Sequence, residues 1–453
     1  MDTVRIGGGL GFYGDTFLPA VDMIRKGAVD FVCFEDLAEL TLAILEKDRE
    51  RDPDAGYTKD LVPMLRACLK PAKEHGVRLV TNAGGLNPRA AARAAEAVAR
   101  ELGVPIRIAV VEGDALLDRL DAFLPFAHME TGAPLPDTVR ARALFANVYL
   151  GAAPIVAALD RGADLVITGR VADPSLFLAP LVHRFGWSFD DLERIARGTV
   201  VGHLLECSSQ VTGGNHGGRW WEIEGLDRIG FPIAEVREDG DIVVTKTPDS
   251  GGRVNFDTVR EQLLYEIHDP SAYVTPDVVL DLSGVRLEEV GPDRVRVDGV
   301  RGHPRPDRYK ALLGYQDGYM GQALIGYSWP DALKKAEATA EILRRQIARM
   351  RLPVEEVRVE YLGWNSLHGP LADTRGAEDL NEVYLRFAVR TPDRRAAEQV
   401  SRLLVPLALG GPPTAGGIIG FDRSRQLLGL WPSLVARGPV DEAVTVDVLE
   451  VTP

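Results

Sequence analysis

Charged residues stand directly after two apolar stretches of the sequence that are typical of β-strands. Glu35 follows residues 31–34, and Arg170 and Asp173 follow residues 165–168. In an open α/β sheet, ligands bind at the carboxyl ends of the strands. An arginine there could bind a carboxylate or a phosphate, and a carboxylate could transfer a proton. We therefore take Glu35, Arg170 and Asp173 as candidate catalytic residues. The alternative is a capped helix start in which Arg170 pairs with a surface carboxylate.

A second group of polar residues lies between residues 202 and 218. His203 and Glu206 are three positions apart, so they would share one face of a helix. Such a pair suits proton transfer or part of a metal site, but a metal centre would need ligands from elsewhere. Cys207 follows an apolar run and is more typical of a buried filler than of a nucleophile. His203 and Glu206 are further candidate catalytic residues, and we assign no metal site.

Glycine-rich turns also follow several strand-like runs, and their backbone amides could approach an anionic ligand. Gly9, Gly11 and Gly14 match the G-x-G-x-x-G pattern of dinucleotide-binding folds. This match is common by chance, and a second glycine-rich turn at residues 84–88 is not required in such a fold, so we assign no nicotinamide cofactor. The candidate ligand-binding residues are Gly8, Gly9, Gly11, Asp15, Asn82, Gly84, Gly85, Gly213, Gly214, Asn215, Gly251 and Gly252.

An alternation of short apolar strands and amphipathic helices in the first half of the chain must position these residues. Strands are expected at residues 4–6, 31–34, 78–81, 106–111 and 165–168, and helices at residues 17–26, 37–50, 88–102 and 141–161. This order predicts an α/β fold with a mostly parallel, Rossmann-like sheet, for which an elaborated barrel is the alternative. Because turns after parallel strands emerge along one edge, we expect the five turns to form one site.

The second half of the chain predicts an α+β part. The expected elements are strand 322–327, helix 331–349, strands 356–362 and 382–389, helix 393–405 and strand 444–451. Their order is the βαββαβ of ferredoxin-like folds. The glycine-rich segment 410–420 is typical of a lid or an interface. We therefore expect an α/β domain at residues 1–218 and an α+β domain with ferredoxin-like topology at residues 219–453.

The composition is typical of a folded protein that binds small molecules rather than nucleic acid. The 453 residues carry a formal net charge of -14, whereas nucleic acids and anionic membranes attract proteins with a basic surface. The three cysteines stand singly, which favours neither a disulfide framework nor a zinc site. No segment approaches the roughly 18 apolar residues of a membrane-spanning helix. We predict a cytoplasmic homo-oligomer with no membrane and no nucleic-acid partner.

Several longer motifs together resemble one known protein family. They are NAGGLNPRAAA at residues 82–92, LGAAPIVAALDRGADLVITGRVADPSLFLAPLVHRFGW at residues 150–187 and GHLLECSSQVTGG at residues 202–214. Jointly they make the chain similar to the acyclic terpene utilisation AtuA family over almost its whole length. Longer members resemble this chain with a small ferredoxin-fold domain added at the C-terminus. This sequence stops near Pro453 and is expected to lack that domain. The resemblance therefore implies either a separate small ferredoxin-fold subunit as a candidate partner or a protein that does not need the module.

The resemblance also implies a catabolic role. The family takes its name from gene clusters for citronellol and geraniol breakdown, which suggests branched acyl-CoA or hydroxy-acid intermediates. With the strand-end residues, this predicts a lyase or hydro-lyase that acts on a branched-chain acyl-CoA or a related hydroxy or carboxylic acid. A CoA thioester is a candidate substrate, and no cofactor is assigned. Two alternatives stay open: a non-catalytic ligand-binding or assembly subunit of a catabolic complex, and a metal-dependent enzyme built on Glu35, Asp36, His203 and Glu206.

Overall fold

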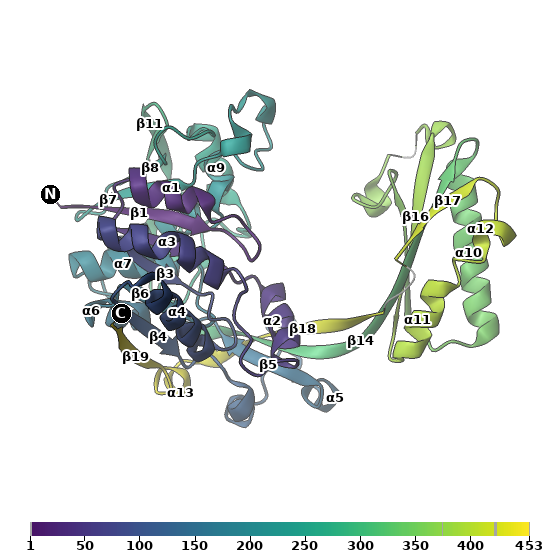
Figure 1. Cartoon of the computed structure of the whole chain (residues 1–453), viewed down its shortest axis with the longest axis horizontal. Helices are drawn as coiled ribbons and strands as arrows, with labels where there is room; N and C mark the ends of the chain where they lie inside the picture. The colour runs from purple at the N-terminus through teal and green to yellow at the C-terminus, as the bar shows by residue number, and fades with distance from the viewer. Residues whose placement is uncertain (1, 374, 421–423, 453) are drawn as a thin grey trace. The chain divides into compact units, whose positions relative to one another are not determined.

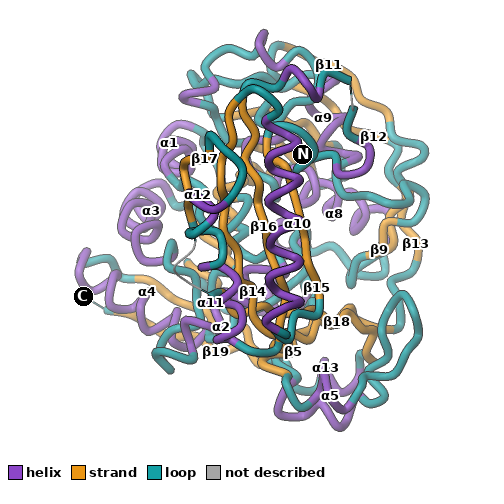
Figure 2. The backbone as a smooth tube through the Cα atoms, turned by 90° about the vertical axis from the view of Figure 1, so that its right-hand side faces the viewer, coloured by secondary structure: helices purple, strands orange, loops and turns teal. Residues whose placement is uncertain are grey.

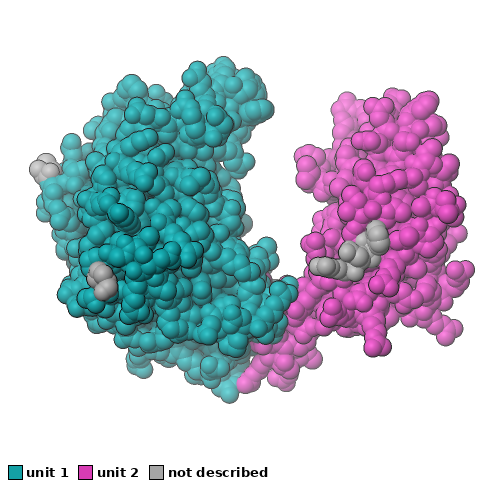
Figure 3. Space-filling view, in the orientation of Figure 1, with its two compact units in different colours: residues 1–135, 144–313, 431–453 teal, residues 136–143, 314–430 magenta. Residues whose placement is uncertain are grey.

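The structure is a computed structural model that describes residues 2–373, 375–420 and 424–452. The chain forms two compact units, which are coloured separately in Figure 3. Unit 1 comprises residues 1–135, 144–313 and 431–453, and unit 2 comprises residues 136–143 and 314–430. The boundary expected between residues 218 and 219 falls inside unit 1, because the strands that follow residue 218 join the sheet of that unit.

Unit 1 is built on one mixed β-sheet, which has ten strands in the described residues. Its centre is parallel, in the order β1 (Thr3–Leu10), β2 (Phe31–Phe34), β3 (Arg78–Thr81), β6 (Leu165–Thr168) and β4 (Ile106–Glu112). Antiparallel strands extend it, namely β7 (Pro232–Arg237), β8 (Ile242–Lys246), β12 (Arg294–Asp298) and β11 (Arg286–Gly291) beyond β1, and β19 (Thr445–Val451) beside β4. The predicted α/β class is confirmed, whereas the central strand order differs from the 3-2-1-4-5 order of a Rossmann sheet.

Helices cover both faces of this sheet (Figure 1). One face carries α1 (Leu18–Lys26), α3 (Leu61–His75) and α4 (Pro88–Leu102), and the other carries α6 (Ala153–Asp160), α7 (Ser175–Phe185) and α8 (Leu192–Leu205). The alternation of side chains along β2 explains these two layers. Val32 and Phe34 belong to the core under α1 and α3, whereas Sγ of Cys33 donates a hydrogen bond to the carbonyl oxygen of Leu176 in α7, at 3.2 Å.

Smaller elements complete the described part of unit 1. Helix α2 (Glu39–Arg49) follows β2, and helix α9 (Phe256–Leu264) packs on α8. A separate small sheet contains β9 (Tyr273–Val274), β10 (Val279–Asp281) and β13 (Arg301–His303). Helix α13 (Gly438–Asp441) precedes β19.

Unit 2 consists of a second sheet with helices packed against it, and it has its own core. Its sheet has the order β15 (Glu356–Leu362), β16 (Glu382–Thr391), β14 (Arg308–Ser328) and β17 (Ala415–Ile419). Strands β5 (Ala143–Val148) and β18 (Arg425–Ala436) also pair with β14, and the unit boundaries fall within these three strands, with almost all of β5 in unit 1. The helices are α10 (Ala332–Met350), α11 (Arg394–Arg402), α12 (Leu407–Gly410) and the short α5 (Asp137–Arg140). Helix α10 lies along the sheet in Figure 2. The core between the sheet and α10 contains Ile325, Leu343 and Phe387, which are fully buried.

The last strand of the chain does not complete the sheet of unit 2, so this part of the prediction is wrong. β19 pairs antiparallel with β4, from Thr445 opposite Glu112 to Val451 opposite Ile106. Val451 is buried in the core of unit 1, which explains the preference for this edge. The strand beside β14 is instead β17, which lies in the glycine-rich segment expected to be a loop.

No helix among the described residues is long and apolar enough to cross a membrane. The 19-residue helix α10 illustrates why, because charged residues such as Lys334, Glu341 and Arg345 recur along it.

The placement of β19 can be tested with Val448→Pro, because proline lacks the backbone N–H and disturbs strand pairing. Val448 lies opposite Ala109 of β4. We expect the amides of β4 to exchange hydrogen at least about tenfold faster, which corresponds to about 1.4 kcal/mol of local stability. Mass spectrometry of peptides from β4 and β16 measures this, with Val448→Thr as the control. Faster exchange in β16 rather than in β4 would contradict the placement.

Candidate functional site

A cavity of about 620 Å³ lies in unit 1 at the carboxyl ends of β1, β2 and β6. The turns after these strands supply Gly11, Glu35 and Arg170 to its wall, and the segment after α8 supplies Glu206. The other lining residues are Phe12, Asp15, Leu37, Ala38, Glu39, Tyr149, Asp173, Cys207, Ser208, Ser209, Gln210, Gly214, Asn215, Tyr265, Glu266 and Lys310. Three of the five turns that were expected to form one site therefore reach the cavity.

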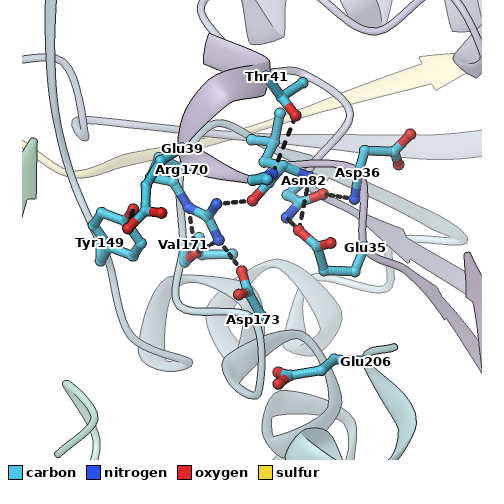
Figure 4. A network of polar contacts seen from close by, with 12 residues as sticks. Glu35, Asp36, Glu39, Thr41, Asn82, Tyr149, Arg170, Val171, Asp173 and Glu206 are labelled. Carbon is cyan, nitrogen blue, oxygen red and sulfur yellow. Dashed lines mark hydrogen bonds and ion pairs between the residues drawn. The ribbon is translucent and has the colours of Figure 1, made fainter. Parts of the chain in front are cut away.

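The guanidinium group of Arg170 lies in the wall of this cavity, with 1% of the residue exposed (Figure 4). Its Nε donates a hydrogen bond to the carbonyl oxygen of Val171 at 2.7 Å, and Nη1 donates to the carbonyl oxygen of Leu37. Nη2 donates both to the Val171 carbonyl and to Oδ1 of Asp173. Cζ also lies 4.6 Å from the centre of the Tyr149 ring, which makes a cation–π contact.

These bonds restrict what Arg170 can do for a ligand. An arginine has five N–H groups, and four donor bonds of Arg170 are already made within the described residues. At most one N–H group is left for a ligand, so a two-point clamp on a carboxylate would require Asp173 to move away. The buried positive charge still acts on the cavity and favours negative charge there.

The buried side chain of Asp114 contacts the backbone of Arg170 and holds the turn after β6 in place. Its Oδ2 accepts hydrogen bonds from the backbone N–H of Arg170 at 2.9 Å and from Nδ2 of Asn147 at 2.7 Å. Burial raises the pKa of Asp114 to about 6, although these hydrogen bonds act in the opposite direction. A Cβ atom on Gly169 would lie 2.5 Å from Oδ1 of Asp114, so only glycine allows the turn to approach this carboxylate so closely.

Glu35 presents a carboxyl group to the cavity from the turn after β2 (Figure 4). Its Oε1 accepts hydrogen bonds from the backbone N–H of Leu37 at 2.7 Å and from Nδ2 of Asn82 at 2.9 Å. Oδ1 of Asn82 in turn accepts a bond from the backbone N–H of Asp36 at 2.7 Å. Burial raises the pKa of Glu35, while the charge of Arg170 and the Asn82 hydrogen bond partly oppose this. Asn82 therefore orients Glu35 and does not line the cavity.

His203 and Glu206 form the pair expected from their spacing. Oε1 of Glu206 lies 3.2 Å from Nδ1 of His203, and Nε2 of His203 lies 3.2 Å from the carbonyl oxygen of Leu263. A carbonyl oxygen can only accept, so Nε2 must carry a proton. Nδ1 and Oε1 then need one further proton between them, which makes either a neutral pair or an imidazolium–carboxylate pair. His203 does not line the cavity, so it acts on the site through Glu206.

The other carboxyl oxygen of Glu206, Oε2, is buried and has no hydrogen-bond partner among the described residues. Glu206 is 8% exposed and lines the cavity. Burial raises its pKa, and the hydrogen bond with His203 partly offsets this. The charge of Glu206 also contributes to the raised pKa of Glu35. An unpaired buried acceptor costs about 1–3 kcal/mol, and a substrate hydroxyl or the carboxyl group's own proton would relieve this cost.

Glu39, Tyr149 and Lys310 are among the lining residues that were not singled out as functional from the sequence. Oε1 of Glu39 accepts hydrogen bonds from Nζ of Lys310 at 2.8 Å and from the Tyr149 hydroxyl at 3.2 Å. Burial raises the pKa of Glu39, but the hydrogen bond and charge of Lys310 outweigh burial and lower it overall. Nζ of Lys310 also lies 4.7 Å from the centre of the Tyr149 ring. Lys310 comes from β14, so no local motif indicates its presence at this site.

Most of the predicted ligand-binding glycines do not line this cavity and are closely packed. Gly11, Asp15, Gly214 and Asn215 line the cavity, whereas Gly8, Gly9, Gly84, Gly85, Gly213, Gly251 and Gly252 do not. A Cβ atom on Gly8 would lie 2.5 Å from the carbonyl oxygen of Leu205, and one on Gly84 would lie 2.4 Å from that of Thr168. The backbone N–H of Gly11 already donates to Oδ2 of Asp15 at 3.1 Å. The N–H group of Gly11 is therefore used within the first turn and is not available to a phosphate.

Cys207 lines the cavity without being an activated nucleophile, and Asp36 lies outside the cavity. Burial and the charge of Glu206 raise the pKa of Cys207, so this thiol stays protonated. Asp36 accepts hydrogen bonds from Thr58 and Thr81, at 3.2 and 3.1 Å, and does not line the cavity. Among the described residues, no three histidine, cysteine, aspartate or glutamate side chains are grouped as a metal site requires.

The close approach at Gly169 predicts that Gly169→Ala destabilises the protein by about 1–3 kcal/mol, because the new methyl group displaces Asp114 from the Arg170 amide. Gly438→Ala is the matched control, since a Cβ there would meet nothing within 4 Å, and it should change stability by less than about 0.5 kcal/mol. Urea denaturation measures both variants. Equal stability of the two would contradict the tight packing at Gly169.

The raised pKa of Asp114 predicts a pH-dependent stability. The folded protein holds this proton more tightly than the unfolded chain, whose carboxyl has the usual pKa of 3.8. The contribution of Asp114 is therefore complete below about pH 4 and is lost as the pH rises through about 6. Relative to Asp114→Asn, the free energy of unfolding of the wild type should fall by about 3 kcal/mol across this range. Denaturation at several pH values tests this, with the exposed Asp22→Asn as control; a pH-independent difference would contradict it.

Comparison with known proteins agrees with the motifs of the sequence. A family model described as acyclic terpene utilisation family protein AtuA matches residues 4–446, which include every residue of the cavity. No curated protein and no solved structure matches the chain significantly. Because the family model covers almost the entire sequence, the chain belongs to the acyclic terpene utilisation AtuA family.

Proposed function

We propose that this protein is an enzyme of acyclic terpene catabolism that eliminates or adds a group next to a carbonyl by acid–base catalysis. A hydro-lyase or lyase acting on a branched-chain acyl-CoA, or on a related hydroxy or carboxylic acid, fits this description. The observation that carries the proposal is that Glu35 and Glu206 line one cavity, and that Oε2 of Glu206 is buried without a hydrogen-bond partner among the described residues. Two carboxyl groups with raised pKa values in one cavity can divide the roles of proton donor and proton acceptor.

In a hydro-lyase reaction, the ionised member of the pair removes the proton from the carbon next to the carbonyl. The C–O bond to the hydroxyl group on the neighbouring carbon then breaks, and the protonated member gives its proton to the departing hydroxyl, which leaves as water. The negative charge that develops on the carbonyl oxygen would be stabilised by the cationic Arg170 and its remaining N–H group. His203 keeps Glu206 in position and shares its proton, so it is a positioning residue.

A lyase reaction would use the same groups in another order. The base removes the proton of a hydroxyl group, the adjacent C–C bond breaks, and the electron pair passes to the carbonyl as an enolate. The acid then protonates the enolate carbon. Both reactions need a proton acceptor and a proton donor in one cavity, and Glu35 and Glu206 would take these roles.

The charges of the cavity favour the carbonyl end of a substrate over a phosphate. Six carboxylate side chains line it (Asp15, Glu35, Glu39, Asp173, Glu206 and Glu266), and its wall has two cationic side chains in the described residues, Arg170 and Lys310. Both cations already bind carboxylates. If the substrate is a CoA thioester, its phosphates would therefore remain outside this cavity.

A non-catalytic ligand-binding or assembly subunit is the alternative. It would also require a cavity, but it would not require two proton-carrying groups in it. Stabilisation of the protein by CoA esters without any turnover would favour this alternative.

We also infer that unit 2 is a ferredoxin-like module. The order along the chain is β14, α10, β15, β16, α11 and β17, and neighbouring strands in the order β15-β16-β14-β17 are antiparallel. These features support a split βαβ arrangement. The predicted homo-oligomer and the separate ferredoxin-fold subunit as partner remain proposals beside it.

The acid–base proposal predicts that Glu35→Gln and Glu206→Gln each slow proton exchange at the carbon next to the carbonyl by about 100-fold or more. Deuterium uptake from D₂O into a 3-methyl-branched 3-hydroxyacyl-CoA, followed by mass spectrometry, measures this rate. Glu46→Gln is the matched control, because Glu46 is a buried glutamate with a raised pKa that does not line the cavity. Wild-type exchange in both cavity variants would refute the assignment.

A further inference from the structure

A second hollow of about 520 Å³ lies beside the polar cavity in unit 1. Its wall is largely apolar. The apolar side chains in it include Met129, Ile267, Val274, Pro276 and Leu434. They come from segments far apart in the sequence, including β9 and the end of β18. The fold therefore assembles an apolar surface here that no single amphipathic element would produce.

Large apolar side chains in this wall are unusually exposed. Val274 is 59% exposed, Leu434 is 43% exposed and Met129 is 42% exposed. Single exposed apolar residues are common on proteins, but three that converge on one concave surface indicate a binding site. Burial of an apolar ligand against them would remove this surface from water.

The apolar hollow and the polar cavity have four lining residues in common: Tyr149, Asp173, Glu266 and Lys310. These side chains form the boundary between the two. A molecule with a polar head and an apolar chain could therefore place its head beside Glu35 and Glu206 and its chain beside Val274.

Arg437 holds the backbone of the apolar hollow in place at Pro276. Its Nη1 donates a hydrogen bond to the carbonyl oxygen of Pro276 at 2.9 Å, and Nη2 donates to the hydroxyl of Tyr309 at 2.7 Å. Cζ of Arg437 also lies 3.9 Å from the centre of the Tyr309 ring. This fixed backbone is what a preformed ligand site requires, because little order has to be gained on binding.

We propose that the apolar hollow binds the hydrocarbon chain of the substrate whose carbonyl end reacts between Glu35 and Glu206. This inference rests on the proposed function and adds a specificity site to it, with Val274 and Leu434 as residues that select chain length. The substrate class is thus a carboxylic acid or thioester with an extended hydrocarbon chain. Short acyl groups would reach the polar cavity but would leave the hollow unfilled.

Binding of acyl N-acetylcysteamine thioesters with four, six, eight and ten carbons tests this site without the nucleotide of CoA. Calorimetric titration of the full chain should show an affinity that rises about two- to fourfold per added methylene until the hollow is filled. Val274→Asp and Leu434→Asp should each abolish this rise with chain length. Leu18→Asp is the control, since Leu18 is 66% exposed and lines neither hollow.

An affinity that does not depend on chain length would overturn the inference, and so would a rise that survives both substitutions in folded variants. A change of oligomeric state in Val274→Asp and Leu434→Asp, with chain-length dependence intact, would also overturn it by identifying the surface as an interface between copies. These failures are separate from failure of the proposed function, which is read from the deuterium exchange of Glu35→Gln and Glu206→Gln.

Discussion

The burial of the Arg170 charge is the constraint on which the candidate site depends. A guanidinium group removed from water is stable only when its N–H groups are satisfied, and here Val171, Leu37 and Asp173 accept them. These bonds join the turn after β6 to the turn after β2, which are separate in sequence but adjacent at the sheet edge. The same bonds leave little of Arg170 for a ligand, so its main contribution to the cavity is its charge.

That charge also sets the balance of the two carboxyl groups in the cavity. Burial raises the pKa of both Glu35 and Glu206, whereas the positive charge of Arg170 lowers it for each. Because burial outweighs this attraction, both pKa values remain raised. His203 shares a proton with Glu206 and not with Glu35, so the two carboxyl groups have unequal environments. Unequal environments allow one group to donate a proton while the other accepts one.

The part of the site that could be predicted from the sequence is the part set by local pattern. The apolar runs of β2 and β6 placed Glu35, Arg170 and Asp173 at one sheet edge, and the spacing of His203 and Glu206 placed them together. The glycines were ambiguous, because close packing of backbone and close approach to a ligand require the same residue. Lys310 arrives from a distant strand, and the alternation in residues 445–451 shows a strand but not which sheet it joins. Such features depend on long-range packing, which local periodicity does not record.

The chain separates into two units, and the candidate site lies within one of them. Every side chain that lines the polar cavity or the apolar hollow belongs to unit 1. Ile325, Leu343 and Phe387 form a separate core within unit 2. The pKa values of Glu35 and Glu206 depend on charges and burial within a few ångströms, so the causes identified for them all lie in unit 1. Substitutions in the unit 2 core should therefore act through the stability of that unit and leave the proton balance of the cavity unchanged.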